Sequence, residues 1–400
     1  MRRAVWALLV AFAFSVPWAY SVDLGWPFGH IARLLGLAAL FAGIVTILLS
    51  GDVRTPRGLQ WLVLACLLWF CCTAFWSIDE HATFVRLRAF FQVMLPVWLV
   101  WEFIDTPVDW GDLLRAWVGG SLVLAVLTIV SFSSAGFGTQ IRFAATDQDP
   151  NDVARFLDVG FPMAALVIDG NWKWPWKLMA ATYLSAGLVG VLLTASRSGF
   201  LGALIALSGC AVLLLRRYHR ILIAIFLPTA AAVWFVVPHR ALERIATISE
   251  QLQRGDLNQR LNIWAAGWQA FIRAPFFGSG AGTFVQAARL SPIDTAHNTA
   301  LTIAVEGGMV GLIITAAILV VCMRLVLVPR GSLRVALATA FIVCLVASLV
   351  ATVEGNRTTW LLLGMISAAA RLAEEEPGWI GRYFPGSGRR VLRLPQSRTP

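Results

Sequence analysis

Long apolar segments separated by short polar ones make up most of the chain, and this alternation predicts membrane-spanning helices. A helix needs about 20 mostly apolar residues to cross the hydrocarbon core of a bilayer. Segments that approach this length cover residues 4–20, 30–50, 59–76, 83–104, 112–133, 153–169, 177–196, 199–215, 220–237, 297–323, 333–353 and 357–371. The pattern therefore predicts an all-α polytopic membrane protein with about twelve transmembrane helices and no repeat of fixed period.

Composition agrees with this fold class. The chain has 400 residues, of which 58% are hydrophobic and only 14% charged, and its mean hydropathy is +0.73. A water-soluble protein of this length could not bury so much apolar surface, whereas lipid removes the need to do so. The net charge of +10 comes from basic residues between the apolar segments and in the C-terminal tail, a placement typical of membrane orientation rather than of nucleic-acid binding.

The short basic loops orient the predicted spans. Their basic residues all fall on one side of the membrane: Arg2, Arg3, Arg54, Arg57, Lys173, Lys177, Arg216, Arg217, Arg220, Arg330 and Arg334. The positive-inside rule places that side, and both termini, in the cytoplasm. The N-terminal segment resembles a signal peptide without a cleavage site, so it is expected to remain as the first helix.

The predicted spans divide the chain into four parts. Residues 1–237 carry nine transmembrane helices, 238–296 form a large periplasmic loop, 297–371 carry three more helices, and 372–400 form a basic, loosely ordered cytoplasmic tail. All six cysteines lie in or beside apolar segments, and no two are spaced as CxxC, which argues against a disulfide framework or a zinc site.

The large periplasmic loop is expected to contain amphipathic helices. In DLNQRLNIWAAGWQAFI, residues 256–272, one stripe at helical spacing comprises Leu257, Leu261, Trp264, Trp268 and Phe271. Such a helix would rest on the outer leaflet and hold Arg260 at the level of lipid phosphates. The following glycines, Gly278, Gly280 and Gly282, form either a simple turn, the favoured reading, or a phosphate-binding nest.

The segment TAHNTALTIAVEGGMVGL, residues 295–312, carries the candidate base. With Asp294 as a helix cap, His297 would lie in the first turn, with Gly308 and Gly311 below it on one face for close helix packing. Glu306 would point to the opposite side and be structural. A helix N-terminus disfavours an imidazolium, so His297 is either a neutral general base or a histidine that only reaches the interface.

Arginines at the predicted periplasmic side are the candidate anion ligands. Arg197 stands at a tight turn in LLTASRSGFLG, where it contacts either lipid phosphates or a bound anion. Arg142 and Arg357 are expected to face the same cavity, while the roles of Arg86 and Arg88 stay open.

Two aspartates, Asp147 and Asp149, have the DxD spacing with which some glycosyltransferases hold a metal ion and a donor diphosphate. The competing interpretation is turn and cap chemistry before Pro150. The sequence favours the turn.

Several of these motifs together resemble those of bacterial O-antigen ligases. HNTALTIAVEGGMVG resembles the family's signature of His-Asn, nine residues, Gly, two residues, Gly, fitted by His297, Asn298, Gly308 and Gly311. TASRSG resembles its arginine turn at Arg197. The segment from Gln259 to Gly282 resembles its arginine–tryptophan region, with Arg260 and Trp264 matching. The likeness spans roughly residues 75–370 and is strongest over 190–312.

The resemblance implies a membrane-embedded C-type glycosyltransferase of the bacterial inner membrane. Such ligases transfer a polysaccharide from undecaprenyl diphosphate to lipid A–core oligosaccharide at the periplasmic face. They are inverting and metal-independent, so no metal or cofactor is expected. By this resemblance Arg197 and Arg260 bind the diphosphate, His297 is the base, and Asn298 and Trp264 contact substrate. Arg142 and Arg357, which are expected to face the same cavity, are further candidate substrate-binding residues. O-antigen and exopolysaccharide polymerases share the signature, and a lipid-linked oligosaccharide flippase remains a further alternative.

Overall fold

The computed structural model describes residues 1–25, 29–135, 141–145, 148–246, 260–291 and 294–384. Apart from one isolated bridge between Asp23 and His30, regular structure in these residues is helical. The helices are α1 (Arg2–Ser15), η1 (Ala19–Ser21), α2 (Ile31–Ser50), α3 (Gly58–Cys72), η2 (Thr73–Phe75), α4 (Glu80–Phe103), α5 (Pro107–Ala135), α6 (Pro150–Asp169), α7 (Trp174–Leu193), α8 (Arg197–Val236), α9 (His239–Ala246), α11 (Arg260–Arg273), α12 (Phe284–Ala288), α13 (Thr299–Leu327), α14 (Gly331–Val350), α15 (Arg357–Glu375) and α16 (Trp379–Tyr383).

Eight helical segments in the described chain are long and apolar enough to cross a membrane, which confirms the polytopic membrane fold class. They lie on α2, α3 with η2, α4, α5, α7, the first part of α8, α13 and α14. The remaining predicted spans fall on α1, α6, the second part of α8 and α15. Both α6 and α15 are buried by neighbouring helices along most of their length, so they can carry more polar residues than a lipid-facing helix.

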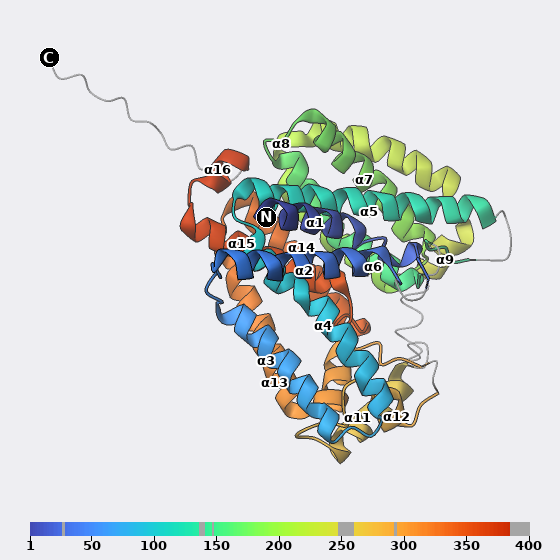
Figure 1. Cartoon of the computed structure of the whole chain (residues 1–400). Helices are drawn as coiled ribbons and strands as arrows, with labels where there is room; N and C mark the ends of the chain where they lie inside the picture. The colour runs from blue at the N-terminus through green and yellow to red at the C-terminus, as the bar shows by residue number, and fades with distance from the viewer. Residues whose placement is uncertain (26–28, 136–140, 146–147, 247–259, 292–293, 385–400) are drawn as a thin grey trace.

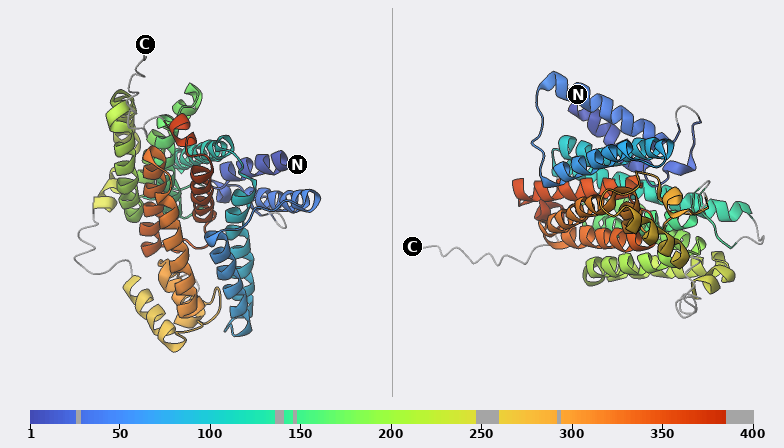
Figure 2. Two further views of the ribbon diagram at one scale, coloured as in Figure 1. Left: turned by 90° about the vertical axis from the view of Figure 1, so that its left-hand side faces the viewer. Right: turned by 90° about the horizontal axis from the view of Figure 1, so that it is seen from below.

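The helices form two groups that differ in direction (Figure 1). One group has α6 at its centre, packed against α5, α7, α8 and α14. In the other group α3 and α4 run obliquely beside α13, and α11 and α12 lie at the far ends of these helices. Figure 2 shows this oblique group extending away from α8 in the perpendicular view.

The long helix α8 is two antiparallel arms. Its backbone leaves helical geometry at Tyr218, with φ −124° and ψ 28°. A straight helix of 40 residues would be about 60 Å long. Instead, Arg197 at its start donates from Nε to the carbonyl of Arg244, which lies beyond its end, at 3.0 Å. The chain therefore turns back near Tyr218, between the predicted segments 199–215 and 220–237.

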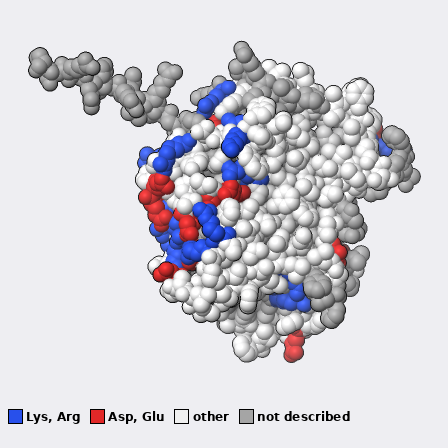
Figure 3. Space-filling model, turned by 45° about the horizontal axis from the view of Figure 1, so that its top comes forward, with Lys and Arg blue, Asp and Glu red and all other residues white. Residues whose placement is uncertain are grey.

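Basic and acidic side chains gather on one side of the molecule (Figure 3). Among the ion pairs, Arg2 binds Glu102 at 3.1 Å and Asp105 at 3.0 Å, and Arg54 binds Asp105 at 2.7 Å. These contacts place the N-terminus, the α2–α3 loop and the end of α4 on a common face. It is the face that the basic short loops predict to be cytoplasmic, so the opposite end is called the outer end below.

The tail is more ordered than expected at its beginning. Arg371 is only 2% exposed, lies within α15, and donates to the carbonyl of Ile104 and to Glu375. Trp379 and Phe384 are also buried. Residues 372–384 thus belong to the packed fold, which corrects the expectation of a loose tail over that stretch, while 385–400 lie outside the described residues.

Helix α13 breaks at Gly308. The residue has φ 65° and ψ −163°, a conformation that is essentially restricted to glycine. The expectation that Gly308 lies on a continuous helical face below His297 is therefore wrong. Gly311, beyond the break, does lie against a neighbouring helix, because a Cβ there would stand 3.4 Å from the Trp69 ring of α3.

The loop of residues 275–280 fills the break in α13, and the two segments together are called the clasp. The amides of Ser279 and Gly280 donate to the carbonyls of Val305 and Glu306 at 2.8 and 3.0 Å. In return, Met309 N donates to the carbonyl of Pro275 at 2.8 Å. The donors at 279 and 280 are therefore occupied by protein, and the phosphate-nest reading of this glycine-rich loop is wrong.

Side chains complete the clasp. Trp69 donates from its indole N–H to the carbonyl of Gly307 at 2.9 Å. Glu306 is 1% exposed and faces Arg86 of α4 at 3.4 Å, in agreement with its predicted structural role. Of the two uncertain arginines, Arg86 is therefore the inward one, whereas Arg88 is exposed.

Gly308→Ala should destabilise the protein strongly. The backbone conformation alone costs a non-glycine residue about 1–3 kcal/mol, and the new Cβ would lie 2.3 Å from the carbonyl oxygen of Phe276. Thermal unfolding in detergent, followed by size exclusion, should show a lower midpoint. Gly378→Ala is the matched control, because nothing lies within 4 Å of a Cβ there. Equal midpoints for the two variants would contradict this account of the break.

Candidate functional site

The candidate base lies just before α13 rather than inside it. Asn298 is the N-cap, and its side chain accepts from the amide of Leu301 at 2.9 Å. His297 precedes the cap with φ 45°, an uncommon conformation for a residue with a side chain. The expected cap, Asp294, instead accepts from the amide of Ser291 at 3.2 Å. The predicted first-turn position of His297 is therefore wrong, because the helix begins four residues later than predicted and leaves His297 just before the cap.

Helix α11 supports the backbone beside His297. The indole N–H of Trp264 donates to the carbonyl of Ala296 at 2.9 Å. The imidazole Nε2 lies 3.0 Å from the hydroxyl of Thr295. Because its N–H group is engaged in this way, Trp264 helps to fix the position of the histidine.

The connection between α14 and α15 holds the other side of the helix start. Thr299 donates from Oγ1 to the carbonyl of Ala351 and accepts from the amide of Val353, both at 2.8 Å. Asn298 donates from Nδ2 to the carbonyl of Leu349 at 3.3 Å. An unusual backbone conformation persists where the surroundings over-determine it, and these contacts do so for His297.

The environment keeps the imidazole neutral. Burial is the largest cause that lowers the pKa of His297 below its ordinary value, and the positive charge of Arg260 is the second. Asp149 acts in the opposite direction, and Arg155 reinforces the lowering of this pKa. The sequence predicted the direction correctly but attributed it to a helix N-terminus, which His297 does not occupy.

Arg197 begins α8 at a turn fixed by short-range hydrogen bonds. Ser196 caps the helix by accepting from the amide of Gly199 at 3.2 Å, and its hydroxyl donates to Asn151 Oδ1 at 2.9 Å. Arg197 itself reaches the carbonyl of Arg244. The start of α6, the α7–α8 turn and α9 therefore meet at the outer end of the bundle.

Arg142 joins this group from the α5–α6 connection. It donates from Nε to the carbonyl of Thr194 at 3.2 Å, and from its terminal nitrogen to Asn151 Oδ1 at 2.7 Å. Burial lowers the pKa of Arg142; the charges of Arg244, Arg197 and Arg260 lower it further, and Asp149 opposes them. The four guanidinium groups of Arg142, Arg197, Arg244 and Arg260 are called the arginine cluster.

Arg260 connects the arginine cluster to the histidine. It starts α11, burial lowers its pKa, and Asp149 raises it. In addition to burial, the positive charges of Arg197 and Arg260 lower the pKa of Arg142, and the charge of Arg260 lowers the pKa of His297. Arg260 is therefore the residue whose charge acts both on Arg142 of the arginine cluster and on His297.

Helix α11 uses only part of the predicted stripe for packing, since Phe271 is buried and Trp264 packs beside it. Its buried residues are Ile263, Gly267, Ala270 and Phe271, which face α12 and α13. Two members of the predicted stripe, Leu261 and Trp268, are 46% and 54% exposed, and Leu257 lies outside the described residues. The helix is thus held by protein on one side and presents apolar side chains on the other.

Asp149 is a cap. Its side chain accepts from the amide of Asn151 at 2.7 Å, at the start of α6, and Pro150 occupies the first helical position. This confirms turn and cap chemistry for Asp149, while Asp147 lies outside the described residues. In the described chain Asp149 also supplies negative charge to Arg142, Arg260 and His297.

Arg357 occupies a different neighbourhood from the arginine cluster. As the first residue of α15, it donates to Gln92 Oε1 at 3.5 Å and lies 5.9 Å from the ring centre of Tyr20. Its contacts are therefore with α4 and η1. The charges of Arg197 and Arg260 act on Arg142, and that of Arg260 acts on His297, whereas Arg357 has separate partners.

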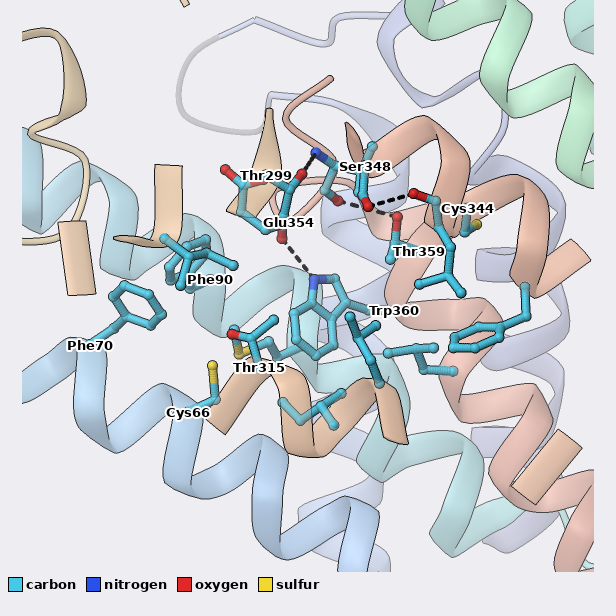
Figure 4. Close-up of a pocket in the computed structure, with 18 residues that line it drawn as sticks. Cys66, Phe70, Phe90, Thr299, Thr315, Cys344, Ser348, Glu354, Thr359 and Trp360 are labelled. Atoms are coloured by element: carbon cyan, nitrogen blue, oxygen red, sulfur yellow. Dashed lines mark hydrogen bonds between the residues drawn. The ribbon is translucent and has the colours of Figure 1, made fainter. Parts of the chain in front are cut away.

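An apolar cavity of about 80 Å³ lies on the inner side of Thr299 (Figure 4). Its wall includes Phe70, Phe90, Thr315, Cys344 and Trp360, from α3, α4, α13, α14 and α15. The polar groups in Figure 4 mostly bond to protein, as when the Trp360 indole donates to the carbonyl of Glu354 at 2.8 Å. Such a wall does not suit a sugar, so we place the chemistry outside it, among the charged residues.

Two charged residues of the site were missed by sequence reasoning. Arg155 of α6 pairs with Asp152 and acts on His297. Arg244 lies in α9, where its carbonyl accepts from Arg197. The spacing of Asp152 and Arg155, three residues apart at the outer end of a predicted span, was the available signal for the first of them.

Comparison with known families bears on the same part of the chain. A family model described as O-antigen ligase matches residues 181–316. This third of the chain contains Arg197, Arg260 and His297, so the expected resemblance to that family is confirmed. No curated protein matches the chain.

Arg260→Ala should raise the pKa of His297 toward its ordinary value. The substitution removes a positive charge that disfavours the imidazolium. An NMR titration of protein labelled at its five histidines would measure the change, with His297→Gln assigning the signal. Arg273→Ala, at the other end of α11, is the matched control. An unshifted titration in Arg260→Ala would show that the two side chains are electrostatically independent.

Proposed function

From the match of residues 181–316 to the O-antigen ligase family, we propose that the protein transfers a glycan from undecaprenyl diphosphate to lipid A–core oligosaccharide. The transfer would take place at the periplasmic face of the bacterial inner membrane. The observation that carries the proposal is the arginine cluster beside a neutral histidine. The charges of Arg197, Arg244 and Arg260, with that of Asp149, act on Arg142, and guanidinium groups are well suited to binding a phosphate.

The diphosphate would bind to Arg197 and Arg260. A guanidinium group forms paired hydrogen bonds with phosphate oxygens and keeps its charge even when partly buried. Arg142 stands beside both arginines and would add a third charge. As the carrier diphosphate leaves with the electron pair of its bond to the sugar, these groups would stabilise the charge that develops on it.

His297 would act as the general base. It removes the proton from an acceptor hydroxyl while the oxygen of that hydroxyl forms a bond to the anomeric carbon. At the same time the bond between the anomeric carbon and the diphosphate oxygen breaks. The imidazolium then returns the proton to water. Attack from the face opposite the leaving diphosphate inverts the anomeric centre. Asn298 and Trp264 would contribute by holding the histidine and, as the resemblance implies, by contacting substrate.

A polymerase is the main alternative, because both activities use a carrier-linked donor and the matched family region does not separate them. A flippase is less well supported. Transporters commonly bind substrate at broken helices near the bilayer midplane, and α13 is broken at Gly308. The freed backbone groups there are bonded to residues of the clasp, which leaves them unavailable to a transported ligand.

Arg197→Ala, Arg260→Ala and His297→Ala should each abolish detectable transfer at unchanged protein level. Loss of a general base costs about 10²–10⁴-fold in rate. Loss of a contact to developing charge costs about 2.7–4 kcal/mol. The lipopolysaccharide ladder of cells that express each variant gives the readout, and Arg240→Ala, exposed on α9, is the matched control. Near-normal ladders from His297→Ala would remove the base assignment.

Reconstitution in liposomes should separate a ligase from a polymerase. With undecaprenyl-diphosphate-linked glycan and lipid A–core, a ligase produces glycan attached to lipid A–core in a single step. Longer carrier-linked chains without such a product would instead identify a polymerase. Addition of a chelator should leave the activity unchanged, whereas loss restored by Mg²⁺ or Mn²⁺ would contradict the metal-independent mechanism.

A further inference from the structure

A second group of polar side chains lies at the outer end of the bundle, beside the candidate active site. It comprises Tyr20, His30, Gln92, Gln148 and Arg357 and is called the Arg357 cluster. Arg357 contacts Gln92 and Tyr20 as described above, and the Tyr20 ring packs edge-on against His30 with centres 5.0 Å apart. Gln148 donates from Nε2 to the hydroxyl of Ser21, the neighbour of Tyr20, at 2.8 Å.

Several polar atoms of this cluster lack adequate partners. His30 Nδ1 and Gln148 Oε1 are both buried without a hydrogen-bond partner among the described residues. Arg357 contacts an amide oxygen at the long distance of 3.5 Å and an aromatic ring. Arg86, in contrast, faces the carboxylates of Glu306 and Glu354. Buried polar atoms in native proteins are nearly always satisfied by protein, ordered water or a ligand, so these groups can donate to or accept from a ligand bound here.

The side chains of the Arg357 cluster suit one kind of ligand. The carboxamides of Gln92 and Gln148 both donate and accept hydrogen bonds, as neighbouring sugar hydroxyls require. The guanidinium of Arg357 matches the paired oxygens of a phosphate or a carboxylate. Together they fit a saccharide that carries an anionic group.

The cluster is placed to serve the acceptor rather than the donor. Gln148 directly precedes Asp149, whose negative charge acts on His297. The segment from Ala351 to Val353, which leads to Arg357, is hydrogen-bonded to Thr299. The cluster thus adjoins the base, yet its contacts are with η1 and α4 instead of the arginine cluster. A displacement with inversion brings the nucleophile from the side opposite the leaving diphosphate, so the two substrates need separate sites.

We propose that the Arg357 cluster binds the acceptor oligosaccharide through a phosphate or carboxylate group on one of its sugars. This inference rests on the proposed glycosyl transfer and adds the place and chemistry of acceptor recognition.

Arg357→Ala and Gln92→Ala should raise the KM for lipid A–core at least tenfold, while kcat and the KM for the carrier-linked donor change less than twofold. The measurement uses the full-length protein in liposomes and lipid A–core purified from cells that lack the gene. Arg88→Ala is the matched control, because Arg88 lies one helical turn from Gln92 on α4 and is exposed. A variant that merely damaged the fold would lower kcat or protein yield instead. A raised donor KM, or an unchanged acceptor KM, would overturn the proposal.

Chemically modified acceptors identify the anionic group. Wild-type protein should show a raised KM either for lipid A–core dephosphorylated with hydrofluoric acid or for lipid A–core amidated at its carboxylates. For Arg357→Ala, the modification that raises the KM of the wild-type protein should leave the KM unchanged. If neither modification changes the wild-type KM, the assignment of Arg357 to an anionic acceptor group is wrong.

One experiment distinguishes an error in the ligase proposal from an error in the proposal that the Arg357 cluster binds the acceptor. If wild-type protein only lengthens carrier-linked chains, the ligase proposal is wrong. The elongation rates of the variants are then compared at a limiting concentration of carrier-linked acceptor. Elongation by Arg357→Ala at least tenfold slower than by Arg88→Ala would still support the cluster as the acceptor site. Equal rates would overturn it.

Discussion

The demand of the backbone for hydrogen bonds inside the membrane is the constraint on which the rest of the structure depends. Helix α13 leaves helical geometry at Gly308, and within a membrane the freed N–H and C=O groups would need partners. The loop of residues 275–280 and the indole of Trp69 supply them. A segment of the predicted periplasmic loop is thereby fixed to a transmembrane helix.

This fixation has a direct chemical consequence. Helix α11 leads into the clasp loop, and its Trp264 bonds to the residue before His297. Arg260 begins the same helix, so its distance from the histidine is set by the same contacts. Arg142 approaches from the α5–α6 connection and Arg197 from the start of α8, and both add positive charge. Guanidinium groups match the geometry of phosphate oxygens, which is the physical argument that the site suits an anion.

Much of the fold and part of the site could be predicted from the sequence. Apolar segments of membrane length identified the helices, because lipid imposes that length on every span, and the outer-end arginines followed from loop position. The start of α13 could not be read correctly, since Asp294 and Asn298 are both good caps and only tertiary contacts at Thr299 decide between them. The break at Gly308 could not be predicted from the sequence either, because it is stabilised by a loop 30 residues earlier in the chain. Arg155 was overlooked because two of the charges that act on it, those of Glu354 and Arg260, come from distant segments.

The central claim is that Arg197 and Arg260 hold a lipid-borne diphosphate within reach of His297. A structure of the full-length protein in nanodiscs with undecaprenyl diphosphate bound would test it most directly. We expect both phosphates to lie within hydrogen-bonding distance of these two guanidinium groups, with the imidazole facing the position of the transferred sugar. Diphosphate bound elsewhere, with the arginine cluster contacting only protein and bilayer headgroups, would contradict the account.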